Sequence, residues 1–204
     1  MATRKYEQRL RAEHADETRR RILDAVAQCL RERPTEPVRL DQVASVARVA
    51  RSTIYLVFGS RAGLFDAFTE DLWARTGLPA LTEAVGHSDA RQHLRGGIAA
   101  ATRMLAAELD VYRVLHAMSR LDPDSVGGAV DKMRAERSGG MVHLARRLAE
   151  DGALRDGLSV ERAADMLWVL CAFETVDLLL TDRGLGVEET IEVIVNMAEH
   201  AVCS

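Results

Sequence analysis

Apolar residues return every three or four positions along most of this 204-residue chain, which is the spacing of helices that bury one face. No segment sustains the two-residue alternation of β-branched and aromatic residues that is typical of strands. The composition is rich in Ala, Leu, Val, Arg and Glu and poor in aromatics, which favours helix over sheet. We therefore predict an all-α fold of about nine or ten helices.

The first helix is predicted to begin at about Asp16 and to end before Pro34 and Pro37, because proline cannot donate a hydrogen bond within a helix. Residues 1–15 are mostly polar and are expected to form a flexible arm. The buried stripe of this helix comprises Ile22, Leu23, Val26, Ala27 and Leu30.

Two short helices are predicted next, separated by a break near residues 47–50. Ala44 and Ala47 lie on the apolar face of the first, and such small residues let two helices cross closely, as a helix-turn-helix requires. The second is expected from about Arg51 to Val57. It opens with side chains that can reach base edges and phosphates: Arg51, Ser52 and Thr53.

A fourth helix is predicted over about residues 61–76, with Ser60 as its N-cap and with Gly59 at the end of the helix before it. The run Thr-Gly-Leu-Pro at 76–79 then breaks the pattern. We therefore expect a DNA-binding domain at 16–76, in which a three-helix helix-turn-helix is followed by a helix that links it to the body, and a helical body at 77–204. The body helices are expected at about 89–108, 110–120, 125–150, 159–182 and 187–202.

The net charge of −4 is unevenly distributed along the chain. Residues 1–61 hold 13 Lys and Arg against 8 Asp and Glu, a net +5, whereas residues 62–204 hold 14 against 23, a net −9. A basic end on an acidic body is typical of a protein with one DNA-facing end. A chance fluctuation along an Arg-rich chain accounts for the charge equally well.

The sequence indicates no catalytic site, cofactor or metal. It has no glycine-rich phosphate loop, and its six histidines lack the spacing of metal ligands. Cys29, Cys171 and Cys203 are far apart, which fits a reduced cytoplasm. No secretion signal and no run of membrane-spanning length is found. We therefore expect a cytoplasmic protein that is not an enzyme.

Several N-terminal residues keep a fixed pattern without a gap: Ile22-Leu23, Ala27, Val43-Ala44, Val49, Thr53-Ile54-Tyr55, Phe58, Ser60-Arg61 and Leu64-Phe65. With these residues the chain resembles the TetR family of transcriptional regulators. The resemblance covers about 60 residues, and the body resembles the family only in length and helix count.

The resemblance implies a dimeric regulator, usually a repressor, that binds a palindromic operator and is released by a small molecule. It implies phosphate contacts from Thr53, Tyr55 and Arg61, and base contacts from Arg51 and Ser52. Arg39 and Arg48 complete the predicted DNA-binding set. Packing of Tyr55 in the core with its hydroxyl in water is the alternative for that residue.

The chain departs from the family pattern at four positions. Arg48 replaces a turn glycine, and Ala50 replaces a capping serine, so that an N-cap is lost. Leu56 and Val57 are apolar beside the expected DNA face, where many members have a polar or aromatic residue. Few polar groups therefore remain for base readout.

The two C-terminal segments of the body are strongly apolar, and a monomer of this size would struggle to cover both. We therefore predict a homodimer through the last two helices, as the resemblance also implies.

Glu174 and Asp177 share one side of an apolar stretch and could face solvent, the dimer seam or a cationic ligand. An effector pocket is predicted from Met104, Tyr112, His116, Met118, Trp168 and Cys171, with ordinary core packing as the alternative for each.

These observations predict a ligand-responsive DNA-binding repressor. The first competing hypothesis is an all-helical small-molecule-binding protein or enzyme with an incidental helix-turn-helix, which would require clustered acid and base residues in a cleft. The second is a structural DNA-binding protein without a ligand, which would have a closed and fully packed body.

Overall fold

The computed structural model describes residues 2–33 and 36–204, with the backbone alone at residues 2–5, 7–9, 11 and 12. The all-α prediction is confirmed, because this part of the chain contains eleven α-helices, two short π-helical segments and no strand. The chain divides into two compact units. Unit 1 comprises Met1–Asp71 and Arg113–Val130, and unit 2 comprises Leu72–Tyr112 and Asp131–Ser204.

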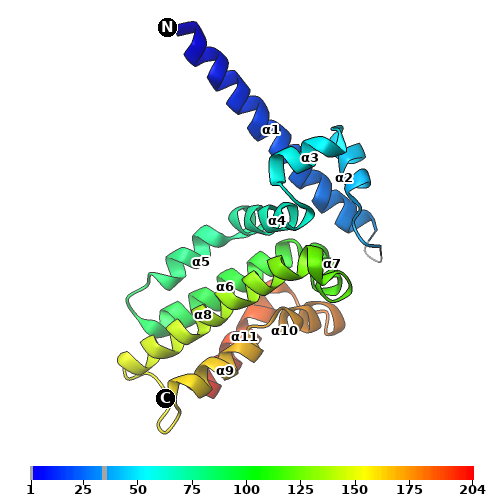
Figure 1. Ribbon diagram of the computed structural model, residues 1–204. Coiled ribbons are helices and arrows are strands. Elements are labelled where there is room, and N and C mark those ends of the chain that lie inside the picture. Colours follow the sequence, from blue (N-terminus) through cyan, green and yellow to red (C-terminus); the bar gives the residue numbers. More distant parts are fainter. Residues whose placement is uncertain (1, 34–35) are drawn as a thin grey trace. The chain divides into compact units, whose positions relative to one another are not determined.

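Unit 1 is built around the N-terminal helices. Figure 1 shows α2 and α3 lying against α1. The core of this unit includes Ile22, Val26 and Leu30 of α1, Ile54 of α3, and Leu64, Phe65 and Phe68 of α4, all with 0% exposure. Its elements are α1 (Ala2–Glu32), α2 (Leu40–Ala47), α3 (Arg51–Phe58), most of α4 (Arg61–Thr76), most of α7 (Leu109–Leu121) and the π-helical η1 (Pro123–Gly127).

The first helix begins earlier than predicted. The structure continues α1 back to Ala2, so that residues 2–15, expected as a flexible arm, form its first turns. Residues 2–32 include no proline or glycine, and therefore nothing in the sequence interrupts a helix there. The helix ends at Glu32, ahead of Pro34 as predicted, although Pro34 and Thr35 themselves lie outside the described residues.

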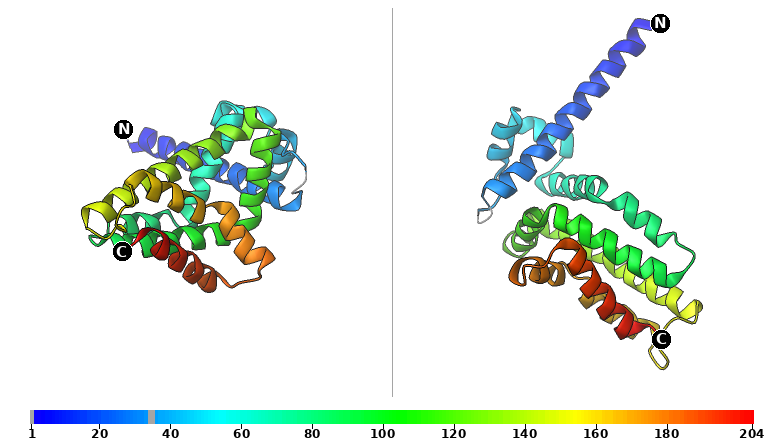
Figure 2. Two further views of the ribbon diagram at one scale, coloured as in Figure 1. Left: turned by 90° about the horizontal axis from the view of Figure 1, so that it is seen from below. Right: turned by 180° about the vertical axis from the view of Figure 1, so that it is seen from behind.

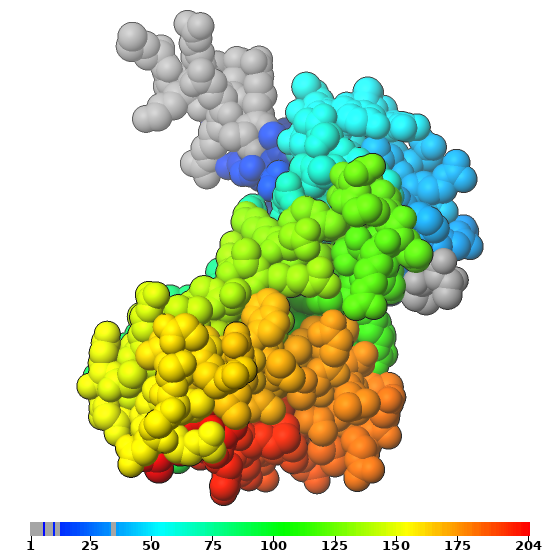
Figure 3. Space-filling model, turned by 60° about the horizontal axis from the view of Figure 1, so that its bottom comes forward, coloured from blue at the N-terminus to red at the C-terminus, as the bar shows by residue number. Residues whose placement is uncertain are grey.

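Unit 2 packs its helices around one apolar cluster, contributed mainly by α6, α8, α9 and α11. Figure 2 shows α11, in red, beside the green α6 in the view from behind. In Figure 3, α9, α10, η2 and α11 occupy one face, from amber to red. The elements are α5 (Leu78–Val85), α6 (Ala90–Ala107), most of α8 (Gly128–Glu150), α9 (Val160–Leu170), α10 (Phe173–Asp177), the π-helical η2 (Leu178–Asp182) and α11 (Val187–Val202).

Sequence patterns located the body helices except in two places. Helix α5 was not predicted, because Gly77 and Pro79 together indicate a break, yet proline is compatible with the first turn of a helix. The helix expected from Ser159 to about Asp182 does begin there, with Ser159 Oγ accepting from the Arg162 N–H at 3.2 Å. It breaks, however, after Leu170, where Cys171 and the extended Ala172 separate α9 from α10.

Candidate nucleic-acid interface

The turn between α2 and α3 is held in a left-handed conformation by a residue other than glycine. α2 turns Val43, Ala44 and Ala47 into the core of unit 1, as the close helix crossing requires. Arg48 follows with φ 53° and ψ 49°, and among the described residues it alone has a positive φ without being glycine. Its N–H donates to Ser45 O at 3.2 Å, and the Val49 N–H donates to Ala44 O at 3.0 Å. The backbone therefore keeps the turn that the family's glycine would make, with a side chain in its place.

The residues of α3 differ in burial from one side of the helix to the other. Ile54 is fully buried, and Val57 and Phe58 are half-buried on the same side. The opposite side faces solvent through Arg51, Ser52, Tyr55 and Leu56, with Thr53 half-exposed. Tyr55 is 42% exposed, so a large part of this side chain lies outside the core. Four of the seven predicted DNA-binding residues thus lie on one short helix.

Arg51 is held along the exposed side of α3 by two neighbours. Its Nη1 lies 3.2 Å from Asp41 Oδ1, and its Nη2 donates to the Tyr55 hydroxyl at 3.4 Å. The guanidinium also lies 5.8 Å from the centre of the Tyr55 ring, within range of a cation–π contact. The Tyr55 hydroxyl and, next, Asp41 raise the pKa of Arg51, because both favour its charged form.

The N-terminus of α3 has no side-chain cap. Ala50 occupies the N-cap position with φ −71° and ψ 148°, and no side chain accepts there. This confirms the loss expected from the sequence. The backbone N–H groups of the first turn point out of the helix end, where they and the helix dipole favour an anion. Ser60 keeps its predicted role at the next helix, accepting from the Gly63 N–H at 2.9 Å.

Arg61 has structural partners, in contrast to the phosphate contact expected for it. Its Nη1 donates to Asp122 Oδ2 and to Ser125 Oγ, the latter at 2.7 Å, and its Nη2 donates to Val38 O at 2.7 Å. The side chain of Arg61 is 27% exposed and that of Asp122 is 24% exposed. Sequence reasoning missed this network because Asp122 is 61 positions away. Arg61 therefore joins α4 to the end of α7 and to η1 within unit 1.

Arg39 and Arg19 flank the helix-turn-helix. Arg39 is exposed and immediately precedes α2, with its backbone N–H donating to Gln42 Oε1 at 3.3 Å. Arg19 of α1 lies 4.9 Å from the centre of the Phe58 ring, which it partly covers. Phe58 is thus half-buried beneath a cation.

The residues predicted for an effector pocket do not form a single cluster within one unit. Met104 and Tyr112 are buried in unit 2, where Trp168 and Cys171 also lie, whereas His116 and Met118 belong to unit 1. Burial raises the pKa of Tyr112 to about 12 and that of Cys171 to about 11, so both are neutral at pH 7. The ring of Tyr112 packs with its centre 6.2 Å from that of the Phe173 ring.

Arg137 of α8 is the residue that sequence reasoning missed at the break between α9 and α10. Its guanidinium lies 3.5 Å from the centre of the Trp168 ring, and its Nη1 donates to Trp168 O at 2.8 Å. Thr175 Oγ1 donates to Val169 O at 2.9 Å. Side-chain donors therefore satisfy carbonyls at the end of α9, which explains why the helix can stop there. Glu174, beyond the break, faces solvent.

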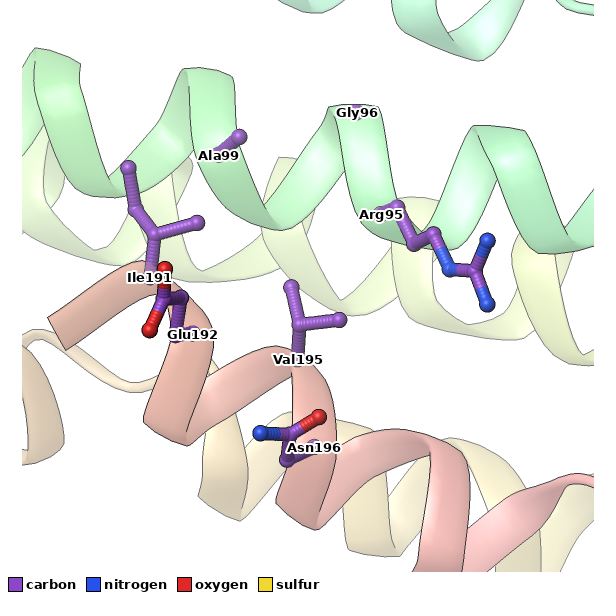
Figure 4. Close-up of a pocket in the computed structure, with 7 residues that line it drawn as sticks. All are labelled: Arg95, Gly96, Ala99, Ile191, Glu192, Val195 and Asn196. Carbon is purple, nitrogen blue, oxygen red and sulfur yellow. The ribbon is translucent and has the colours of Figure 1, made fainter. Parts of the chain in front are cut away.

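A groove of about 550 Å³ lies elsewhere on unit 2, between α6 and α11. Figure 4 shows Ile191 and Val195 of α11 pointing toward α6, with Arg95 extended along that helix. Ion pairs join the same two helices, from Arg95 to Glu199 at 2.6 Å and from Arg103 to Glu188, which precedes Ile191. None of the predicted pocket residues lines this groove.

Within the described ranges, no helix combines the length and the apolar character needed to cross a membrane.

Residues 22–68 match the family model of the bacterial regulatory proteins of the tetR family. No curated protein matches the chain in sequence.

The fold of the whole chain is similar to that of solved regulators. SmeT, the repressor of the Stenotrophomonas maltophilia multidrug efflux pump SmeDEF, is 18% identical, with a TM-score of 0.71 over 92% of this chain and 93% of SmeT. NalD, the secondary repressor of the MexAB-OprM multidrug efflux pump in Pseudomonas aeruginosa, is 22% identical, with a TM-score of 0.71 over 94% and 98%. A putative TetR-family regulator from Rhodococcus sp. is 19% identical, with a TM-score of 0.72 over 93% and 100%. Residues 22–68 thus match the N-terminal domain of the tetR family of bacterial regulatory proteins, and the chain as a whole has the fold of the solved regulators.

Proposed function

We propose that the chain is a ligand-responsive repressor that binds a palindromic operator as a homodimer and is released by a small molecule. The observation that carries the proposal is the exposed side of α3, where Arg51, Ser52 and Tyr55 stand free of the core. Two proteins with this fold, SmeT and NalD, are repressors. Because the proposed target is chromosomal DNA, the proposed site of action is the cytoplasm.

In the proposed complex α3 enters the major groove by its N-terminal end. Arg51 exchanges its contact with Asp41 for the DNA, and the uncapped N–H groups after Ala50 receive a backbone phosphate. Tyr55 donates its hydroxyl to a second phosphate, and Thr53 is close enough on the helix to do the same. Arg48, exposed at the turn, adds a further positive charge. Arg61 is left out of this proposed set because its donors already serve Asp122, Ser125 and Val38.

The proposed dimer uses the face formed by the last helices. α11 turns its apolar stripe, including Ile194, into the core of its own chain, and its outer side is mostly polar. The apolar side chains that remain exposed on these elements are Val169 at 63%, Leu178 at 53% and Met197 at 38%. Light scattering is expected to give twice the chain mass of 22.5 kDa, and Leu178→Glu is expected to shift it toward the single mass. A wild-type mass of one chain at micromolar concentration contradicts the dimer.

The proposed effector site lies in unit 2, near the break that follows α9. Trp168 and Cys171 border this break, and Arg137 presents a cation beside the Trp168 ring. An effector that enters here is expected to change the fluorescence of Trp168, and Trp73→Phe leaves Trp168 as the single tryptophan of the chain. Such a ligand acts as an inducer only if it binds the DNA-free state more tightly. Titrating candidate ligands against the Trp73→Phe protein, with and without DNA, tests both points.

DNA binding itself is tested by fluorescence anisotropy with duplexes from the chain's own promoter region at low salt. Arg51→Ala is expected to weaken binding about tenfold, as the loss of a base contact implies. Tyr55→Phe removes one hydroxyl and is expected to have a smaller effect. Arg146→Ala, an exposed arginine on α8 in unit 2, is the matched control and should leave affinity unchanged. Absence of wild-type binding, or equal affinities for all variants, refutes the proposal.

A further inference from the structure

Leu56 is the most exposed large apolar side chain among the described residues, with 86% of its surface open to solvent. It lies on α3, four positions after Ser52 and next to Tyr55, and therefore on the side of the helix that carries the proposed DNA contacts. Ile54, which is fully buried, lies on the side of α3 that faces the core. Leu56 thus contributes almost nothing to the core of unit 1, and its position has to be explained by what the helix meets outside.

The chemistry of the major groove offers one apolar partner at base edges. Each base pair presents hydrogen-bond donors and acceptors there, and thymine alone adds a methyl group at C5. A leucine cannot donate or accept a hydrogen bond, so it cannot read guanine, cytosine or adenine by pairing groups. It can, however, pack against a methyl group and remove that group from water.

We propose that Leu56 reads a thymine in each half-site of the operator by packing against its C5-methyl group. The inference rests on the proposed operator binding by α3 and adds a specificity-determining residue to it. Leu56 then joins Arg51 and Ser52 in reading bases, while Tyr55 contacts the DNA backbone. Leu56 would thus distinguish thymine from the other bases on a helix that has few polar side chains for hydrogen bonds to base edges.

The decisive comparison uses uracil, which pairs as thymine does and lacks only the C5-methyl group. The full-length wild-type protein first selects a consensus from a random duplex library, and each consensus thymine is then replaced singly by uracil. With wild-type protein, one position per half-site is expected to lose about three- to fivefold in affinity, as the burial of one methyl group implies. With Leu56→Ala, the thymine and uracil duplexes should bind within about 1.5-fold of each other at that position, because the short alanine side chain no longer reaches the methyl group.

Leu121→Ala is the matched control, since Leu121 is a leucine of the same unit with 78% exposure on α7 rather than α3. This variant should keep the full difference between thymine and uracil. If a consensus is selected but no uracil substitution depends on Leu56, or if Leu56→Ala lowers affinity equally for both duplexes at every position, the inference is overturned while operator binding stands. If the wild-type protein selects no consensus, the proposed function itself fails. Circular dichroism of Leu56→Ala should match wild type, because the side chain is outside the core.

Discussion

Arg48 offers the sharpest test of how this helix-turn-helix is built. The residue sits between α2 and α3 with φ 53°, where a Cβ atom approaches the following carbonyl oxygen. Its side chain is exposed, so the guanidinium gives the folded state no packing to offset that strain. The change Arg48→Gly therefore isolates the backbone contribution, because it removes the Cβ atom and leaves the turn hydrogen bonds in place.

The magnitude follows from two opposing effects. A left-handed conformation costs a non-glycine residue about 1–2 kcal/mol, which glycine does not incur. Glycine in turn loses more backbone freedom on folding, by about 0.5–1 kcal/mol. We therefore expect Arg48→Gly to raise the free energy of unfolding by about 0.5–1 kcal/mol, and the Tm by about 1–4 °C for a chain of this length.

Thermal and urea denaturation followed by far-ultraviolet circular dichroism measure this gain. Arg48→Ala is the control, because it removes the same guanidinium and keeps the Cβ atom in the strained conformation. The alanine variant should show no gain, while both variants should lose the same DNA affinity if Arg48 meets a phosphate. Equal stability of the glycine and alanine variants would refute the reasoning, since the backbone strain would then be absent.

Three further changes test other features of the structure. Ala50→Ser supplies the missing N-cap of α3 and is expected to stabilise the protein by about 1 kcal/mol in urea denaturation, whereas Ala50→Val should not. Asp122→Ala removes the charged partner of the half-buried Arg61 guanidinium and is expected to lower the free energy of unfolding by about 1–3 kcal/mol. Asp131→Ala, which breaks an exposed ion pair, is the control and should lower it by less than about 0.5 kcal/mol. Burial, followed by Arg147 and His143, lowers the pKa of His93 from 6.5 to about 4. Between pH 4 and pH 6.5 the unfolded chain therefore binds more protons at this histidine than the folded chain does. The contribution of neutral His93 to the free energy of unfolding is fully present above about pH 6.5, and it falls by up to about 3 kcal/mol as the pH approaches 4. His93→Gln should flatten this dependence of Tm on pH, and an unchanged slope would show that other groups cause it.

Local patterns in the sequence were sufficient for the helix-turn-helix. The spacing of Val43, Ala44 and Ala47 located α2, and Gly59 and Ser60 marked the end of α3 and the start of α4. These features depend on residues within one or two helical turns, where hydrogen bonds and side-chain faces follow directly from the order of the residues. The same patterns placed α6, α7 and α11 to within a residue or two.

The tertiary structure decided which side chains are free to act. Arg61 has the charge expected of a phosphate contact, yet Asp122, distant in sequence, takes up its guanidinium. Arg137 ends α9 from another helix, 31 positions away from Trp168, so a pattern that read as one helix became two. Periodicity reports which face of a helix is apolar, but it does not report what packs against that face or which donors reach its carbonyls. The sequence therefore determined the helices and the family of the N-terminal domain, whereas contacts between distant residues determined which arginines remain available to DNA and left Leu56 exposed on α3.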